Sequence, residues 1–339
     1  FISTDIGASL ANYDAVTQYA FSAKLGGIFY LKDLEGDTNE SLSNSTLNAS
    51  LSHSFDQTLR YNGSLSFAWQ PEPNYSNGIA NSRRDGDYIY VYVSSSLSKA
   101  WTTRYSTTVG ASYSMIDYQE DSAKTDNRQY FNLNLNNRYK WTERLALSIN
   151  WNGSYCDREY GNNEFSNFVM AGAEYAVAQN TSATLRVGPQ FKHVDNYGTK
   201  TYPSAEFGLN HRMSDRFSLG MFVRYSNEAT NTYVPQTGAS YYSNETWRVG
   251  LTSTMKVTHR VSLNAGVNLI SSDYSRPSSS STDTKTLTFN ATAGVKMMLT
   301  NVLALTAQYS YTNGSYSGYN FPMPSYNRNV FSFGMNYSF

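Results

Sequence analysis

The sequence is poor in charge, in cysteine and in long apolar runs, and each shortage excludes a class of protein. Charged residues make up 15% of the 339 residues, against about 25% in average soluble domains. Cys156 is the only cysteine, so no disulfide framework can form within the chain. No run of about 18 apolar residues occurs, which excludes a transmembrane helix. The net charge is zero, which argues against a nucleic-acid partner.

What the sequence does have is a regular alternation of apolar and small polar residues. Residues 145–152 alternate Leu, Leu, Ile and Trp with Ala, Ser, Asn and Asn, and residues 261–269 and 303–311 repeat the pattern. A period of two indicates strands with one apolar and one polar face. A register slip of one residue would move every Asn to the apolar face, so the pairing is tightly constrained. This pattern is typical of transmembrane β-strands, which face lipid on one side and a polar lumen on the other.

The strand signals recur as hairpins with one short and one longer connection. Short connections fall at 55–58, 141–143, 214–215 and 300–301, and longer ones at 71–86, 117–126, 229–241, 273–283 and 314–326. We predict an all-β, antiparallel, up-and-down transmembrane barrel of about sixteen strands, with short turns in the periplasm. The predicted spans are 20–31, 45–54, 59–70, 87–98, 103–116, 127–140, 144–157, 164–176, 182–193, 200–212, 216–228, 242–256, 259–272, 284–298, 303–313 and 327–339. An even count places both ends of the chain in the periplasm.

Residues 1–19 leave two interpretations open before the barrel at 20–339. Ile2, Ile6, Ala8 and Leu10 are spaced as in a strand. A seventeenth strand here would require an eighteenth upstream; the alternative, which we favour, is a periplasmic or lumen-bound tail. No signal peptide is visible at Phe1, so the sequence is expected to be a mature form or a fragment.

The last nine residues form the clearest strand signal. Phe331, Phe333, Met335, Tyr337 and Phe339 alternate with small or polar residues. In water such a face would invite aggregation, whereas in a bilayer it is the lipid face. A terminal strand that ends on Phe resembles the assembly signal of bacterial outer-membrane β-barrels. The resemblance implies an outer-membrane location, contact with outer-membrane lipids and recognition by the barrel-assembly machinery.

The repeating hairpins extend this resemblance over nearly the whole chain. The layout is similar to a β-barrel porin group, some members of which occur with polysaccharide export systems, and no catalytic or binding residue can be carried over from it. No connection exceeds about 16 residues, and segment 71–86 is the best candidate for an inward constriction loop. A long constriction loop is therefore not evident, which departs from trimeric general porins and leaves the oligomeric state open.

Basic residues dominate the predicted lumen positions, many of them near periplasmic strand ends. They are Lys24, Arg60, Arg104, Arg138, Lys140, Arg186, Lys192, Arg212, Arg224, Arg248, Lys256, Arg260, Lys296 and Arg328. The predicted inward acids within strands are Glu174 and Glu206 alone. A wall of one sign attracts counter-ions, which predicts anion preference. The alternative is that these side chains reach to the interface, pair with turn carboxylates or bind lipid headgroups.

Aromatic residues are predicted on the same inner wall, toward the outer end. They are Tyr30, Tyr88, Tyr90, Tyr92, Tyr130, Phe168 and Tyr202. Aromatic faces and phenol hydroxyls could form a path for a carbohydrate, although simple filling of the lumen explains them as well. His193 and Asp195 have no well-placed serine nucleophile, so we predict no enzyme. There is no Gly-rich phosphate loop or cluster of metal ligands, and we predict neither cofactor nor metal.

The sequence thus favours an outer-membrane channel for small hydrophilic solutes, anionic or sugar-like. A first alternative is the outer-membrane exit of a polysaccharide export system with a periplasmic partner. A second is a structural or adhesive surface barrel. Substrate, direction of transport and an open or plugged lumen do not follow from the residues.

Overall fold

The structure is a computed structural model of one chain. It describes residues 2–29, 40–41, 45–70, 87–120, 124, 127–229, 233–234, 239–275, 284–317 and 325–338. Tyr30, Phe339 and segment 71–86, which the sequence singled out, lie outside these residues.

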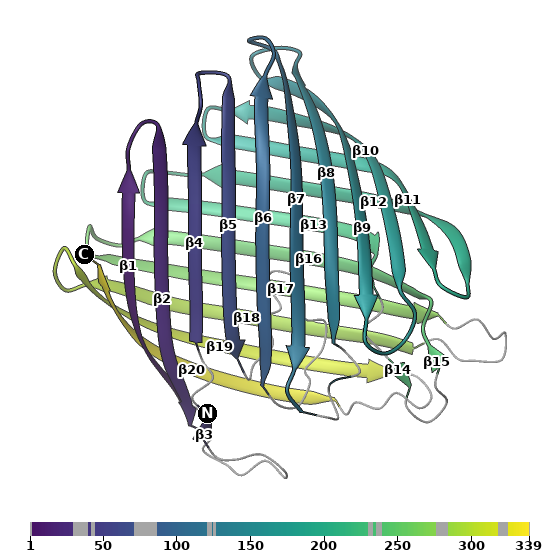
Figure 1. Ribbon diagram of the computed structural model, residues 1–339. Helices are drawn as coiled ribbons and strands as arrows, with labels where there is room; N and C mark the ends of the chain where they lie inside the picture. The colour runs from purple at the N-terminus through teal and green to yellow at the C-terminus, as the bar shows by residue number, and fades with distance from the viewer. Residues whose placement is uncertain are drawn as a thin grey trace.

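The chain closes into one barrel of seventeen strands. Its two walls cross, because β1 to β9 run steeply along one wall while the later strands run across the other (Figure 1). The barrel strands are β1 Ile2–Tyr13, β2 Thr17–Phe29, β4 Ser45–Ser54, β5 Leu59–Gln70, β6 Tyr88–Ala100, β7 Tyr105–Tyr118, β8 Arg128–Lys140, β9 Leu145–Arg158, β10 Glu164–Ala178, β11 Thr181–Val194, β12 Gly198–Arg212, β13 Phe217–Asn227, β16 Ser243–Lys256, β17 Val261–Ser275, β18 Thr284–Met298, β19 Leu303–Ser317 and β20 Tyr326–Ser338. Short β3 Glu40–Ser41 pairs with β2, and β14 Tyr233–Val234 pairs with β15 Ala239–Ser240 outside the barrel sheet.

The alternation in the sequence sets the two faces of each strand. On β9 the side chains of Leu147, Ile149 and Trp151 are exposed on the outer surface, whereas Ala146 and Ser148 are buried on the inner one. A water-soluble fold would not leave such a row of large apolar residues exposed. The outer surface is therefore suited to lipid, and the polar residues line the interior.

The prediction of an all-β transmembrane barrel is confirmed, with one strand more than the sixteen spans proposed. The spans 45–54, 59–70 and 284–298 agree with β4, β5 and β18 residue for residue. The interpretation of residues 1–19 as a tail is wrong for this structure. Residues 2–13 form β1, whose exposed Ile6 and Leu10 lie opposite Leu25 and Phe21 of β2.

The added strand changes how the barrel closes. β1 pairs antiparallel with β2 and parallel with β20, from Ile2 opposite Phe331 to Ser9 opposite Ser338. An odd number of alternating strands makes the first and the last run the same way, so this closing pair must be parallel. Ile2 and Ser338 consequently lie at opposite ends of the barrel, and the expectation of both ends on one side fails for residues 2–338.

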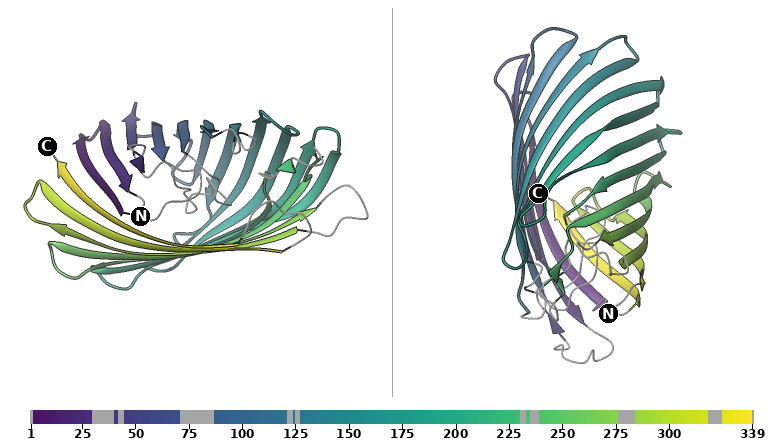
Figure 2. Two further views of the ribbon diagram at one scale, coloured as in Figure 1. Left: turned by 90° about the horizontal axis from the view of Figure 1, so that it is seen from below. Right: turned by 90° about the vertical axis from the view of Figure 1, so that its right-hand side faces the viewer.

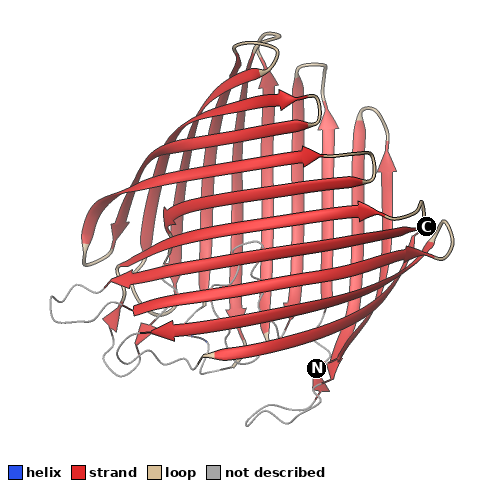
Figure 3. Ribbon diagram, turned by 180° about the vertical axis from the view of Figure 1, so that it is seen from behind, coloured by secondary structure: helices blue, strands red, loops and turns tan. Residues whose placement is uncertain are grey.

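The two rims of the barrel differ in the length of their connections. At one rim, here called the turn end, the strands are joined by residues 14–16, 55–58, 101–104, 141–144, 179–180, 213–216, 257–260 and 299–302. The opposite rim, the loop end, carries the longer connections as well as the three-residue turn 195–197. Figures 2 and 3 show the strands running between the two rims. This asymmetry matches the short periplasmic turns and longer external loops of bacterial barrels.

The six four-residue turns at the turn end have the same hydrogen-bonding arrangement. In the turn 141–144, Thr142 Oγ1 accepts hydrogen bonds from the backbone N–H groups of Arg144 (3.2 Å) and Leu145 (3.0 Å). Turns 101–104, 213–216, 257–260 and 299–302 repeat it with Thr or Ser, and 55–58 uses Asp56. Hydrogen bonds from Thr58 and Leu59 lower the pKa of the Asp56 carboxyl.

Candidate functional site

A polar cavity of about 620 Å³ lies on the inner wall toward the loop end. Asn132, Asn134, Asn150 and Asn152 of β8 and β9 line it, because the inward face of both strands carries asparagine at alternate positions. Each amide offers two donors and an acceptor. The wall can therefore exchange hydrogen bonds with water or with the hydroxyl groups of a solute.

Glu164 is the centre of one buried ion cluster beside this cavity. Its Oε1 accepts from Arg158 Nη2 (2.8 Å) and its Oε2 lies 3.0 Å from Lys192 Nζ. All three side chains are at most 6% exposed. Arg158 also donates to the backbone carbonyl of Asn162, and Lys192 to the side chain of Asn227. The carboxylate and both cations are thus paired and hydrogen-bonded, which burial of charge requires.

Glu228, just after β13, is the centre of a second cluster. Arg248 donates to both carboxylate oxygens, at 2.6 Å each, and Arg224 donates to Oε1. Burial alone would raise the pKa of Glu228, but the two guanidinium groups lower it to about 2. Such a bidentate, charge-assisted contact is among the stronger hydrogen-bonded arrangements in proteins.

The two clusters are joined through the segment that follows β13. Lys192 Nζ donates to the backbone carbonyl of Glu228 (2.8 Å). Gln190 and Asn227 exchange hydrogen bonds between side chain and backbone, at 2.6 and 2.9 Å. The wall of β11, β13 and β16 is therefore a continuous polar network at the loop end, and its geometry is fixed by pairing.

Three further ion pairs occupy the inner wall. Arg138 pairs with Glu174 (2.8 Å), Arg186 with Glu206 (3.5 Å) and Lys24 with Asp5 (3.1 Å). The expectation of only two inward acids is therefore wrong, because Asp5, Glu164 and Glu228 also pair with cations of the inner wall. Asp5 was missed because its strand was interpreted as a tail, and Glu164 and Glu228 because they lie at strand limits.

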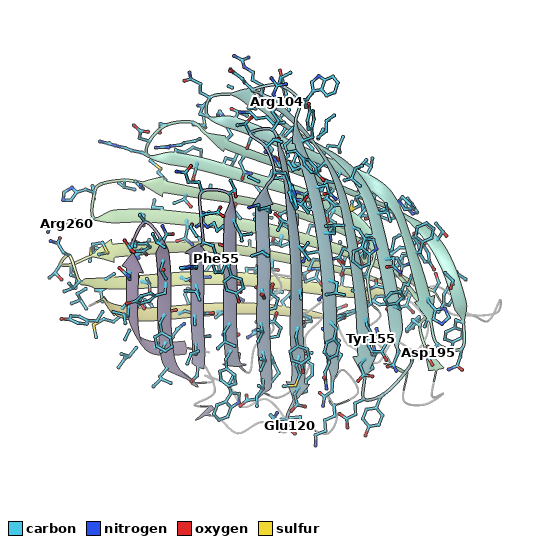
Figure 4. All side chains as sticks on the ribbon, turned by 45° about the horizontal axis from the view of Figure 1, so that its top comes forward. Phe55, Arg104, Glu120, Tyr155, Asp195 and Arg260 are labelled. Carbon is cyan, nitrogen blue, oxygen red and sulfur yellow. The ribbon has the colours of Figure 1, made fainter. Side chains whose placement is uncertain are left out.

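Arg328 lies near the loop end of β20, opposite Thr312, whereas the remaining predicted lumen cations gather at the turn end. Arg60 donates to Ser52 (2.7 Å), and Arg212 pairs with Asp215 (2.8 Å). The others are exposed, and among the described residues none of them lies within ion-pair distance of a carboxylate: Arg104, Lys140, Lys256, Arg260 and Lys296. Arg104 and Arg260 lie at this end, whereas Glu120 and Asp195 lie at the other (Figure 4).

Two more exposed arginines belong with these cations and were missed by the sequence analysis. Arg144 and Arg216 are the last residues of the turns 141–144 and 213–216, and no carboxylate of the described chain pairs with them. For Arg144 a signal was present, because Trp-Thr-Thr-Arg at 101–104 and Trp-Thr-Glu-Arg at 141–144 repeat one pattern. We call the set Arg104, Lys140, Arg144, Arg216, Lys256, Arg260 and Lys296 the turn-end cations.

The predicted lumen aromatics divide into two groups. Tyr90, Tyr130 and Phe168 line the polar cavity, as a sugar path would require. Tyr88 instead packs against Tyr118, with ring centroids 5.7 Å apart, in a small core with Ile116. Filling of the wall is therefore the role of Tyr88. Tyr92 lines a separate cavity together with Tyr88 and Tyr90, and Tyr202 is half-buried on β12.

The described part of the connection between β13 and β16 turns toward the inner wall. Tyr241 is 1% exposed, packs against the tilted ring of the inward-facing Tyr274 and shares a 3.0 Å hydrogen bond with Thr284. With Glu228 held at the start of the same connection, both described ends of this segment are anchored on the inside. The predicted constriction candidate, 71–86, lies outside the described residues.

The remaining predicted positions are on the outer surface. Phe331, Phe333, Met335 and Tyr337 are exposed on the lipid-facing side of β20, as the assembly-signal interpretation requires. His193 is also exposed, bonded to Thr199 and 3.9 Å from Asp195. No group of His, Cys, Asp or Glu within the described ranges could hold a metal ion, and no helix there is long and apolar enough to cross a membrane.

Comparison with known proteins matches residues 185–339 to a family model described as outer membrane protein beta-barrel domain. No curated protein matches the chain. Among solved structures, the FrpB iron transporter from Neisseria meningitidis (F5-1 variant) shares 9% identity over 93% of this chain and 61% of its own, with a TM-score of 0.49. The siderophore receptor PirA from Acinetobacter baumannii shares 8% over 96% and 69%, with a TM-score of 0.43.

The copper transporter OprC shares 11% identity over 93% of this chain and 59% of its own, with a TM-score of 0.47. The FrpB structures are longer proteins, of which the chain spans 59–61%.

Proposed function

We propose that this chain, an outer-membrane β-barrel, is a passive channel for small hydrophilic solutes, with anionic and sugar-like solutes preferred. One observation carries the proposal: an inner wall of hydrogen-bonding side chains encloses a polar cavity, while the outer wall is apolar. A barrel of this size leaves an aqueous interior unless something fills it. Asparagine and tyrosine on the cavity wall offer the donors, acceptors and flat faces that sugars use.

The ion pairs determine where charge selectivity arises. Within the wall Arg138 and Arg186 each have a carboxylate of their own, so they add little net field to the passage. Arg224 and Arg248 share Glu228 and leave one net positive charge at the loop end. No carboxylate among the described residues pairs with the turn-end cations, which set the potential at the other mouth. We therefore assign anion preference to the turn end, and place that mouth in the periplasm because the connections there are short.

The concentration of cations at the turn end also supports a second function. A positive periplasmic mouth would attract an acidic chain from inside, as the exit component of a polysaccharide export system must. In both functions the turn-end cations act through long-range attraction that weakens as salt rises.

Single-channel recording in a planar bilayer, with the reversal potential under a salt gradient, tests the channel. Stable conductance with anion preference is expected. The double variant Arg216→Glu and Lys256→Glu should reduce that preference. Arg186→Gln with Glu206→Gln, which removes a cation together with its paired anion, should change it little. Lys285→Glu, a charge reversal at the loop end, is the control for position. If the folded protein does not conduct, the proposed channel function is wrong.

A further inference from the structure

The arginines of the turn-end cations recur at one position of a repeated turn. Arg104, Arg144, Arg216 and Arg260 are each the fourth residue of a turn, two places after the Thr or Ser that caps it. Repetition at one structural position brings these charges to the same level of the barrel.

The turn itself does not need arginine at this position. Turn 299–302 ends in Val302 and turn 55–58 in Thr58, and both keep the capping hydrogen bonds. The guanidinium groups are exposed and make no ion pair with the described carboxylates. Turn formation therefore does not explain their presence.

The pairing register places like charges opposite one another. The Lys140 backbone N–H donates to the Arg104 carbonyl (2.8 Å), and that of Lys256 to the Arg216 carbonyl (2.7 Å). The next pairs, Tyr105 with Tyr139 and Phe217 with Met255, belong to the outer surface. Both cationic pairs therefore belong to the inner side of the rim, and like charges directly opposite in a sheet are destabilising.

The rest of the wall shows what this chain does with inward cations elsewhere. Arg138, Arg158, Lys192, Arg224 and Arg248 each have a carboxylate partner. Turn-end carboxylates do exist: Asp56 and Asp215 pair with Lys99 and Arg212, and the exposed Asp14 and Glu143 make no ion pair with any described residue. No described carboxylate pairs with the turn-end cations, although like charges opposite one another are unfavourable. Such a set is suited to an anion that comes from outside the protein.

We propose that the turn-end cations are a binding site for an acidic polysaccharide at the mouth of the barrel. The proposal rests on the proposed function, because it takes the lumen as the path beyond the mouth. The inward register turns the site away from the lipid headgroups. The cations are spread from β7 to β18, so an extended ligand with repeated charges can contact several of them, and the wall beyond offers amides and phenols, which suit a sugar chain.

Block of the channel by polygalacturonate tests this site, with neutral dextran as the uncharged control. We expect polygalacturonate to block from the turn-end side only and dextran not at all. The variant Arg216→Glu with Lys256→Glu should raise the half-blocking concentration by about tenfold or more. Arg104→Glu with Lys140→Glu repeats the test on other strands, and Lys285→Glu at the loop end should leave the block unchanged. Heat-modifiable migration on gels confirms that each variant folds.

Other outcomes would overturn the site. Equal potency from both sides, or unchanged block in both double variants, would show that the turn-end cations do not bind the polymer. Stronger block by poly-L-glutamate than by polygalacturonate would reassign the rim to an acidic protein partner.

The proposed channel function and the proposed polysaccharide site can be tested separately. If the protein does not conduct, calorimetric titration of polygalacturonate into the detergent-solubilised barrel still measures binding. Binding that is lost in both double variants and kept in Lys285→Glu supports the site without the channel. No binding to the unaltered protein overturns it.

Discussion

Arg248 holds Glu228 by two hydrogen bonds of 2.6 Å, one to each carboxylate oxygen, and so fixes the connection after β13 to the wall of β16. Arg224 adds a third donor to the same carboxylate. The Glu228 carboxylate therefore balances charge on Arg224 of β13 and on Arg248 of β16. It also anchors the segment that leads toward the buried Tyr241.

Removing this acid should destabilise the barrel. Glu228→Gln leaves the buried Arg248 without its counter-charge, and loss of one partner from a buried pair costs about 3–5 kcal/mol. The free energy of unfolding, from urea titration in lipid vesicles, measures the effect. Glu206→Gln is the control, because its pair with Arg186 is about one-third exposed and 3.5 Å long, so a loss of at most about 1 kcal/mol is expected. Equal losses in the two variants would contradict the assignment.

The same residue gives the protein a defined acid sensitivity. Its pKa falls from an ordinary 4.5 to about 2 in the folded state, so the folded protein binds fewer protons than the unfolded chain between these values. The stability that ionised Glu228 contributes to the folded state is complete above pH 4.5 and is lost as the pH falls toward 2. Unfolding free energy measured across this window should fall less steeply in Glu228→Gln than in the unaltered protein. Parallel curves would count against the pairing.

A charge on the outer surface should cost more than the same charge inside. Leu133 is 56% exposed on the lipid-facing side of β8, and its neighbour Asn134 lines the cavity. Leu133→Arg should lower the unfolding free energy by about 2–4 kcal/mol, the cost of arginine at the bilayer midplane. Asn134→Arg should cost less and shift the reversal potential toward anions. The reverse order would mean that the register of β8 is wrong.

The parallel closing pair can be tested by cross-linking. Ala8 of β1 lies opposite Tyr337 of β20, and neighbouring strands bring their Cα atoms within disulfide range. In a Cys156→Ser background, Ala8→Cys with Tyr337→Cys should oxidise to a cross-link, seen as altered migration of the unfolded chain on gels. Ala8→Cys with Ala307→Cys, one strand farther away, is the control. Cross-linking of the control but not of the test pair would reject the closure.

The sequence predicted the strands well because the alternation is a local property. Spans such as 284–298 follow from the residues they contain, since a polar residue cannot face lipid at low cost. Closure is not local. Whether Ile6 belongs to a tail or to the closing strand depends on its pairing with Met335 of β20, at the other end of the chain.

The ion pairs could not be predicted from the sequence for the same reason. Glu228 and Arg248 are 20 residues apart, and only the register brings them together. Arg144 could have been predicted, because Trp-Thr-x-Arg occurs at both 101–104 and 141–144. The repeat becomes meaningful only once the turns are seen to lie at the same rim of the barrel.

In the four-residue turns, different residues serve anchoring in the bilayer and contact with the ligand. The first residue of the turn, such as Trp101 or Trp141, is exposed on the outer surface, where aromatic belts form. The second residue caps the turn through its side-chain oxygen. The fourth is structurally free, as Val302 shows. A descendant of this protein could thus exchange one ligand preference for another by changes at this one turn position, while the strands, their register and the bilayer anchoring stay as they are.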